Sequence, residues 1–121
     1  MKLNYNCLRS TLLCIEEGLL PTKVFVGSDD IIGSDYCSDY SKDDVINCIQ
    51  FLNDDEMIVA SFLHGCGEVT DFAVSKITPK GYAFLEKTRD NKFWKRLTKH
   101  IDSAGISIGI GSLFQFTMNF K

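Results

Sequence analysis

The sequence predicts an α+β fold of the winged-helix type, in which a helix-turn-helix precedes a two- or three-stranded wing, followed by C-terminal helices and a Gly/Phe-rich tail. An amphipathic helix is expected over 41–54, because Ser41 can cap its first turn. Two β-rich segments joined by a glycine-bearing turn follow it at 57–64 and 68–77. A helix followed by such a hairpin is how a winged-helix domain presents its recognition helix.

Length and composition set the domain organisation. With 121 residues, of which 45% are hydrophobic, the chain can bury a core without a metal or disulfide. We expect a winged-helix domain over 1–102 and a C-terminal extension over 103–121 that packs on the core or forms an interface. The start of the chain has no apolar stretch typical of a signal peptide, and no run approaches the roughly 18 residues of a membrane span. These observations predict a cytoplasmic protein without a membrane partner.

The cysteine pattern favours reduced thiols over a metal site. Five cysteines are present, which is an odd number, and none forms a Cys-x-x-Cys pair. The nearest approach to a metal constellation is His64-x-Cys66, and a single such pair is too few for a usual ligand set. We therefore predict buried or half-buried thiols, no metal and no cofactor.

Charge is distributed unevenly along the chain. Residues 1–60 contain four basic and eleven acidic residues, a net charge of −7, whereas residues 61–121 contain nine basic and five acidic residues, a net charge of +4. The total of −3 hides this asymmetry. An acidic first half and a basic second half are informative about partners and say nothing about the fold.

The first 40 residues predict one helix, one short strand and one helical turn. A helix is expected over 4–17, because Tyr5 begins an apolar stripe at helical spacing and Gly18 suits its end. The β-rich segment 23–26 predicts a small strand. Residues 31–40 are too polar and interrupted for a long helix, so a single turn around 34–40 would be the degenerate second helix.

The helix at 41–54 has two distinct faces. The face expected to be buried carries Val45, Cys48, Ile49 and Leu52. The opposite, exposed face carries Asp43, Asn47, Gln50 and Asp54.

The second half predicts two more helices and a tail. Thr78 as N-cap and Pro79 at the first position start a helix over 79–88. Asp90 or Asn91 caps the next, over 92–102, with basic and apolar faces cleanly separated. In residues 104–121 apolar and polar residues alternate around Gly111-Ser112, which favours a hairpin, although Ile106, Ile110, Leu113 and Phe114 also fit one helical stripe.

The run 77–94 has the pattern hydrophobic-Thr-x-x-Gly-x-x-Phe-Leu-x-x-x-Arg-Asp-x-x-x-Trp. It resembles a small family of bacterial and prophage winged-helix proteins, the YjcQ-like group. The likeness covers residues 1 to about 102, and beyond them the family continues with a helix where this chain has Gly-rich alternation. The resemblance implies a winged helix and an association with phages. It implies no established activity and transfers no catalytic residue.

Catalysis is not expected, because no nucleophile elbow, P-loop, dinucleotide fingerprint or zinc-protease motif is present. Nucleic-acid binding is the first hypothesis, as in a transcription-type regulator. Asn47 and Gln50 could pair with adenine edges in the major groove. The candidate phosphate contacts come from the second half and are Lys87, Arg89, Lys92, Lys95, Arg96 and Lys99. The ordinary alternative is that these form the solvated face of a helix.

Protein binding is the second hypothesis. The helix at 41–54 and its flank are acidic, and phosphates would meet these carboxylates rather than lysines. The acidic residues in question are Asp43, Asp44, Asp54, Asp55 and Glu56. Such a surface could dock on a basic host protein, as an inhibitor or modulator of, for example, a defence nuclease, unless its acids only favour the helix start. The aromatic tail also makes a homo-oligomer plausible.

Overall fold

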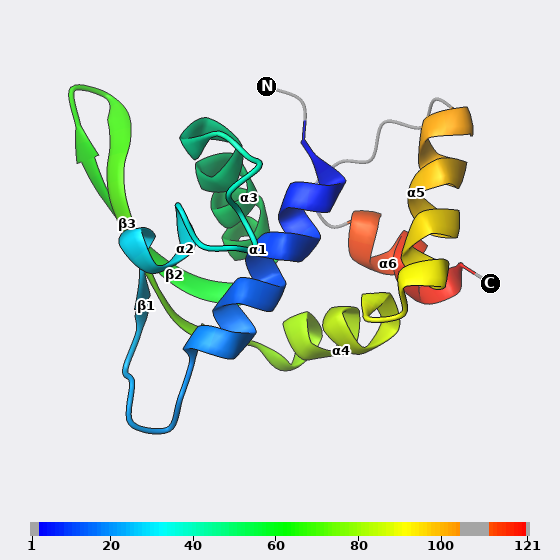
Figure 1. The fold of residues 1–121 in the computed structure, drawn as a ribbon, viewed down its shortest axis with the longest axis horizontal. Helices are drawn as coiled ribbons and strands as arrows, with labels where there is room; N and C mark the ends of the chain where they lie inside the picture. Colours follow the sequence, from blue (N-terminus) through cyan, green and yellow to red (C-terminus); the bar gives the residue numbers. More distant parts are fainter. Residues whose placement is uncertain (1–2, 105–111, 121) are drawn as a thin grey trace.

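The computed structural model describes residues 3–104 and 112–120, which form a mixed α+β fold. Within these residues it contains six helices and one three-stranded antiparallel sheet (Figure 1). In chain order the elements are α1 (Tyr5–Gly18), β1 (Val26–Gly27), α2 (Ser28–Ile31), α3 (Lys42–Asp54), β2 (Ile58–Gly65), β3 (Glu68–Ile77), α4 (Pro79–Thr88), α5 (Asn91–Ala104) and α6 (Ser112–Asn119).

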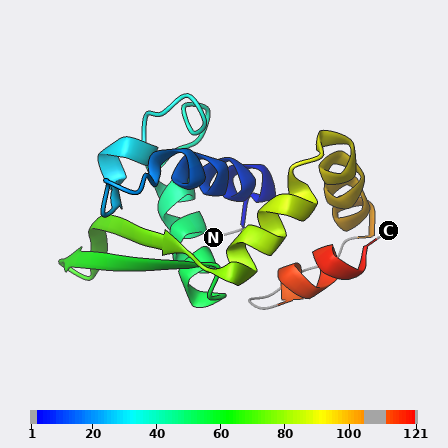
Figure 2. The ribbon, with the colours of Figure 1, turned by 90° about the horizontal axis from the view of Figure 1, so that it is seen from below.

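The molecule is elongated. The sheet lies at one end and α5 and α6 lie at the other, with α1, α3 and α4 between them (Figures 1 and 2). The buried face of α3 packs against α1 and carries Val45, Cys48, Ile49 and Leu52, each fully buried as the sequence pattern predicts. Four of the five cysteines are also buried, and Cys66 is exposed.

The sheet has the strand order β1-β3-β2, so the long hairpin contributes both the central strand and one edge. Gly27 pairs with Ala73, and Ala73 pairs with Ser61, which places three small residues in one row across the sheet. The hairpin turns at Cys66 and Gly67, whose φ angles are 54° and 80°. Two successive positive φ angles are typical of the tight turns that join antiparallel strands.

Side-chain caps start the helices where the sequence predicts them. Ser41 Oγ accepts the backbone N–H of Asp44 at 3.1 Å, and Thr78 Oγ1 accepts that of Gly81 at 3.2 Å. Asp90 Oδ1 accepts the N–H of Lys92 at 2.9 Å, so Asp90 rather than Asn91 is the cap of α5. Each of these bonds satisfies a donor that the first turn of a helix leaves open.

The joint between α3, the hairpin and α4 is closely packed around the Met57 carbonyl. This oxygen accepts the N–H of Thr78 at 3.0 Å and lies directly against Gly81 in α4. A Cβ atom at Gly81 would sit 2.2 Å from the Met57 oxygen and 2.7 Å from Ile77 Cγ2. Only glycine allows α4 to cross the base of the hairpin this closely.

Two predictions about the first 40 residues are corrected. The short second helix is α2 at Ser28–Ile31, whereas residues 34–40 form turns and bends. Asp30 explains the difference, because its carboxylate accepts the N–H of Gly27 at 3.0 Å and so closes the first turn of α2. The strand expected over 23–26 is also shorter and later, since only Val26 and Gly27 pair with β3.

The hairpin expected in the tail is wrong for residues 112–119, which form α6. As a helix, this segment buries Leu113 and Thr117 and packs against α4, while Phe120 contacts the Phe93 ring edge-to-face at 5.8 Å. Apolar and polar residues alternate in this segment, which favoured a strand. The same apolar residues also fit the partly buried face of a short amphipathic helix. The part of that prediction over 105–111 lies outside the described residues.

Gly81→Ala tests the joint. We expect the free energy of unfolding to fall by about 1–3 kcal/mol, because the added methyl group would press against backbone that cannot move without displacing the hairpin. Urea denaturation monitored by circular dichroism measures the change. Gly27→Ala is the matched control, since its nearest neighbours would lie 3.8 Å from the new Cβ. Equal stability of both variants would contradict this account of α4.

Candidate functional site

The exposed side of α3 forms a groove with the edge strand β2. Asn47 and Gln50 are half-buried and line it, together with Phe62 and His64 from β2. The groove has a volume of about 420 Å³, and Asn53 and Asp54 also line it. The structure thus places both predicted base-reading amides in one groove beside the hairpin.

Carboxylates lie at both ends of α3, and of these Asp54 lines the groove. Asp43 and Asp44 lie in the first turn of α3, and Asp54 and Glu56 are exposed at its other end. These four residues are called the acidic surface below. Asp55 does not belong to it, because its side chain is only 3% exposed and its Oδ1 pairs with Lys80 Nζ at 3.0 Å. That ammonium group also lies 4.9 Å from the centre of the Phe114 ring, so the pair helps to hold α6.

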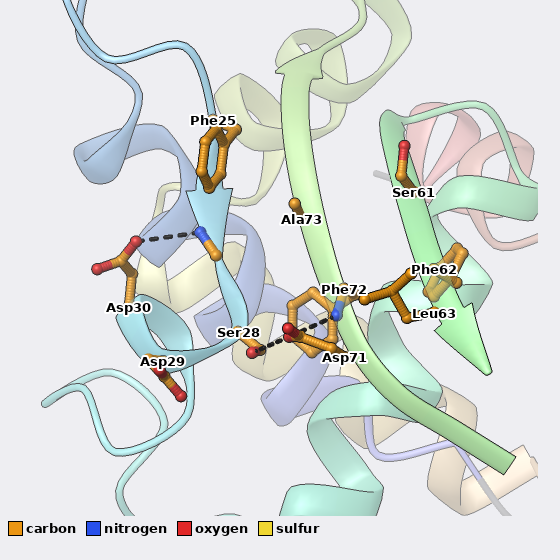
Figure 3. A pocket seen from close by; sticks show the side chains of 11 residues that line it. Phe25, Ser28, Asp29, Asp30, Ser61, Phe62, Leu63, Asp71, Phe72 and Ala73 are labelled. Atoms are coloured by element: carbon orange, nitrogen blue, oxygen red, sulfur yellow. Dashed lines mark hydrogen bonds between the residues drawn. The ribbon is translucent and has the colours of Figure 1, made fainter. Parts of the chain in front are cut away.

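The outer face of the sheet bears a pocket of about 420 Å³, whose lining includes Ser28, Asp29 and Asp30 of α2 (Figure 3). Its floor is the row of Gly27, Ala73 and Ser61, and the exposed side chains of Phe25 and Leu63 flank it. Asp29, Asp30 and Asp71 lie at one side.

Two of these pocket carboxylates are held as anions. The Ser28 hydroxyl and the Phe72 N–H both donate to Asp71 and lower its pKa. The Gly27 N–H and then Lys23 lower the pKa of Asp30 in the same way. The acidic character of this end of the molecule therefore extends from α3 to the outer face of the sheet.

The basic residues of α5 form a stripe at the opposite end. Lys92, Lys95, Arg96 and Lys99 are all exposed, and together they are called the basic stripe below. No ion pair engages them among residues 3–104 and 112–120. Arg96 and Lys87 lie 5.9 and 5.3 Å from the centre of the Phe93 ring, which keeps both cations beside the stripe.

Arg89, which the sequence also suggests as a phosphate contact, is engaged elsewhere. Its guanidinium binds both carboxylate oxygens of Glu16 in α1, at 3.0 and 2.8 Å, and Glu86 at 3.0 Å. These hydrogen bonds hold the pKa of Glu16 below its usual value. Arg89 therefore ties α4 to α1.

Arg9 has a structural role that the sequence did not predict. Its guanidinium donates to the carbonyls of Thr88 and Arg89 and to Asn91 Oδ1, and it lies 5.6 Å from the centre of the Trp94 ring. Arg9 thus caps the end of α4 and fixes the start of α5. The only hint in the sequence was that Arg9 is the single basic residue of this helix.

The described residues contain no cluster of three or more His, Cys, Asp or Glu side chains that could hold a metal. His64 lies in the groove, whereas His100 is far along the chain and stacks with Phe116, so the two do not form a common site. Within the described part of the chain, no helix combines the length and apolar character needed to cross a membrane.

Comparison with known proteins gives one match. The model of a family described as "Hypothetical protein (DUF2513)" matches residues 2–107. No curated protein and no solved structure matches the chain. The expected membership of a family of hypothetical proteins is confirmed, whereas the resemblance of residues 77–94 to the YjcQ-like group stays a prediction.

Glu16→Gln tests the tie between α1 and α4. A carboxylate whose pKa is lower in the folded than in the unfolded protein stabilises the fold above its unfolded pKa, near 4.5, and loses that contribution as pH falls through the folded pKa. We expect the variant to be less stable at pH 7 by about 0.5 kcal/mol, since Arg89 is partly exposed and the pair is screened. Below the folded pKa the difference should vanish.

Urea denaturation at neutral and acid pH measures this dependence. Glu68→Gln, which neutralises an exposed carboxylate in the hairpin, is the control and should change little at either pH. A loss in Glu16→Gln that persists unchanged in acid would mean that the side chain acts through packing alone.

Proposed function

We propose that this chain, which belongs to the family described as Hypothetical protein (DUF2513), is a winged-helix protein that acts by binding another macromolecule and has no catalytic activity of its own. The order α1-β1-α2-α3-β2-β3 and the sheet order β1-β3-β2 support this fold type. In such a domain α3 occupies the place of the recognition helix. The resemblance to the YjcQ-like group points to the same fold and to a phage setting.

The acidic surface around α3 carries the proposal. A helix that enters a DNA groove needs Lys and Arg beside the phosphates, because their neutralisation supplies most of the non-specific affinity. Here Lys42 is the only basic residue within α3, against Asp43, Asp44 and Asp54. This balance favours a partner protein with a basic surface.

Charge complementarity would speed association with such a partner. A basic surface that normally holds nucleic acid has the required chemistry. Inhibition or modulation of a host nuclease or regulator is the corresponding role.

The basic stripe favours a second candidate function, which is binding of nucleic acid through α5. Its four cations are exposed and free of acidic partners in the described residues, and they lie at the end of the molecule away from the acidic surface. A transcription-type role would then use the phosphate backbone through α5 rather than base edges through α3.

A gel shift with a random-sequence DNA duplex over a salt series separates the two functions. We expect no shift at physiological salt. Any shift at low salt should weaken steeply as salt rises and should be lost in the double variant Lys95→Glu/Lys99→Glu. The control Asn47→Ala/Gln50→Ala should leave it unchanged. Sequence-selective binding that depends on Asn47 and Gln50 would contradict the assignment of α3 to a protein partner.

Photo-crosslinking in cells tests the protein-binding role. With p-benzoylphenylalanine at Asn47, in the groove, we expect a covalent adduct to a protein. The adduct should disappear when Asp43→Lys and Asp54→Lys are added, because the acidic surface would then repel a basic partner. The same group at Tyr82, an exposed residue of α4, is the control. Equal adducts at both positions, or an adduct that survives charge reversal, would argue against this surface.

A further inference from the structure

We propose that the free edge of β2 is a docking edge, to which an extended segment of the partner protein adds as a fourth strand, with basic side chains in the α3–β2 groove. The inference rests on the proposed function, because it assumes a basic protein partner. It goes further in naming the strand that is bound and the pattern of the segment that binds.

In the described part of the chain, the sheet order leaves one side of β2 without a neighbouring strand. Val59 and Leu63 direct their carbonyls toward β3, where these accept the hydroxyls of Ser75 and Thr70, each at 3.2 Å. Because backbone direction alternates along a strand, the backbone groups of Ala60, Phe62 and His64 point to the open edge.

Ala60 confirms this direction, since its N–H donates outward to Asn53 Oδ1 at 3.0 Å. The side chain of Asn53 thus occupies the first position of the edge. The outward groups of Phe62 and His64 have no partner of this kind among the described residues, so this is where a new strand can pair.

The edge strand also lacks charged and proline residues, although its register against β3 shifts between Val59 and Ala60 and between Leu63 and His64. Natural edge strands avoid pairing with another chain through charged residues such as Lys, through proline, or through β-bulges. The eight residues of β2 include no proline, lysine, arginine or carboxylate. Instead, Val59 and Leu63 are 41% and 64% exposed on the outer face of the sheet, where Figure 3 shows Leu63 beside the pocket.

The two faces of β2 define what an added strand would carry. On the inner face lies the groove, where the Asp54 carboxylate and the side-chain oxygens of Asn47 and Gln50 offer acceptors. On the outer face Leu63 offers apolar contact. Because side chains alternate between the faces of a strand, the segment should alternate basic and apolar residues.

Charge decides between a partner and a second copy of this chain. Symmetric pairing of β2 with its own copy would bring together two acidic surfaces, and like charges across an interface are unfavourable. The same surface attracts a basic segment. We therefore assign the edge to a different protein.

The probe is the peptide Lys-Val-Lys-Val-Lys-Val-Lys with blocked ends, titrated into the full ¹⁵N-labelled chain. We expect the amide hydrogens of Phe62 and His64 to exchange with solvent at least about tenfold more slowly in the complex, because they become hydrogen-bonded. Those of Ser61 and Leu63 already face β3 and serve as internal controls. A peptide methylated on every backbone nitrogen keeps its charge and side chains but cannot donate, so it should not bind.

Asp54→Lys should weaken binding of the probe at least about tenfold. Asp39→Lys, at an exposed carboxylate outside the groove, makes the same charge change and should have a much smaller effect. Failure of the peptide to protect Phe62 and His64 at millimolar concentration overturns strand addition, as does equal binding of the methylated peptide. If the crosslink at Asn47 still forms, the proposed function stands without it. If that crosslink is absent too, both the protein-binding role and strand addition at β2 are contradicted.

Discussion

The carbonyl of Met57 is the contact on which the arrangement of the chain depends. It lies where α3 has just ended, where β2 begins and where α4 crosses, and it accepts the N–H that follows β3. The Met57 carbonyl leaves no room for a side chain at position 81. Because Gly81 has none, α4 can cross the hairpin closely, and this contact sets its direction relative to the hairpin. That direction carries the rest of the chain away from the sheet, so α5 and α6 form a separate end (Figure 1).

This geometry sorts the charged residues into two groups. Those in the middle of the molecule hold it together: Arg9 on the end of α4, Arg89 on Glu16, and Lys80 on Asp55. The others are exposed or half-buried and lie in two separate places, acidic along α3 and basic along α5 at the end away from the sheet. Separation of opposite charges favours an oriented encounter with a charged partner, because each place attracts a different surface.

Local signals made much of the fold predictable. Ser41, Thr78 with Pro79, and Asp90 identify helix starts from single residues, and the apolar stripe of α3 identifies its buried face. The short α2 was misplaced because its cap depends on Asp30, an acid among many in a polar stretch. The tail was predicted as a hairpin because its apolar residues fit both the two-residue period of a strand and the stripe of a helix. Only packing against α4 selects the helix.

The candidate site was only partly predictable, for a related reason. Composition identifies acidic and basic segments. It cannot show that Asp55 and Arg89 form ion pairs with residues distant in the sequence and are therefore not available to a partner. Nor can it show that Asn47 and Gln50 face β2 across a groove. The open edge of β2 depends on strand order, which follows from the pairing of β1 with β3, a strand that lies more than 40 residues further along the chain.

The turn at Cys66 gives the molecule a built-in attachment point. Because the other four cysteines are buried, a thiol reagent can reach this one at the tip of the hairpin while the fold stays intact. A fluorophore or spin label placed there would report on the end of β2 without any engineered substitution. The same exposure means that the purified protein can form covalent dimers in air, so a reductant is needed before any measurement of its assembly state.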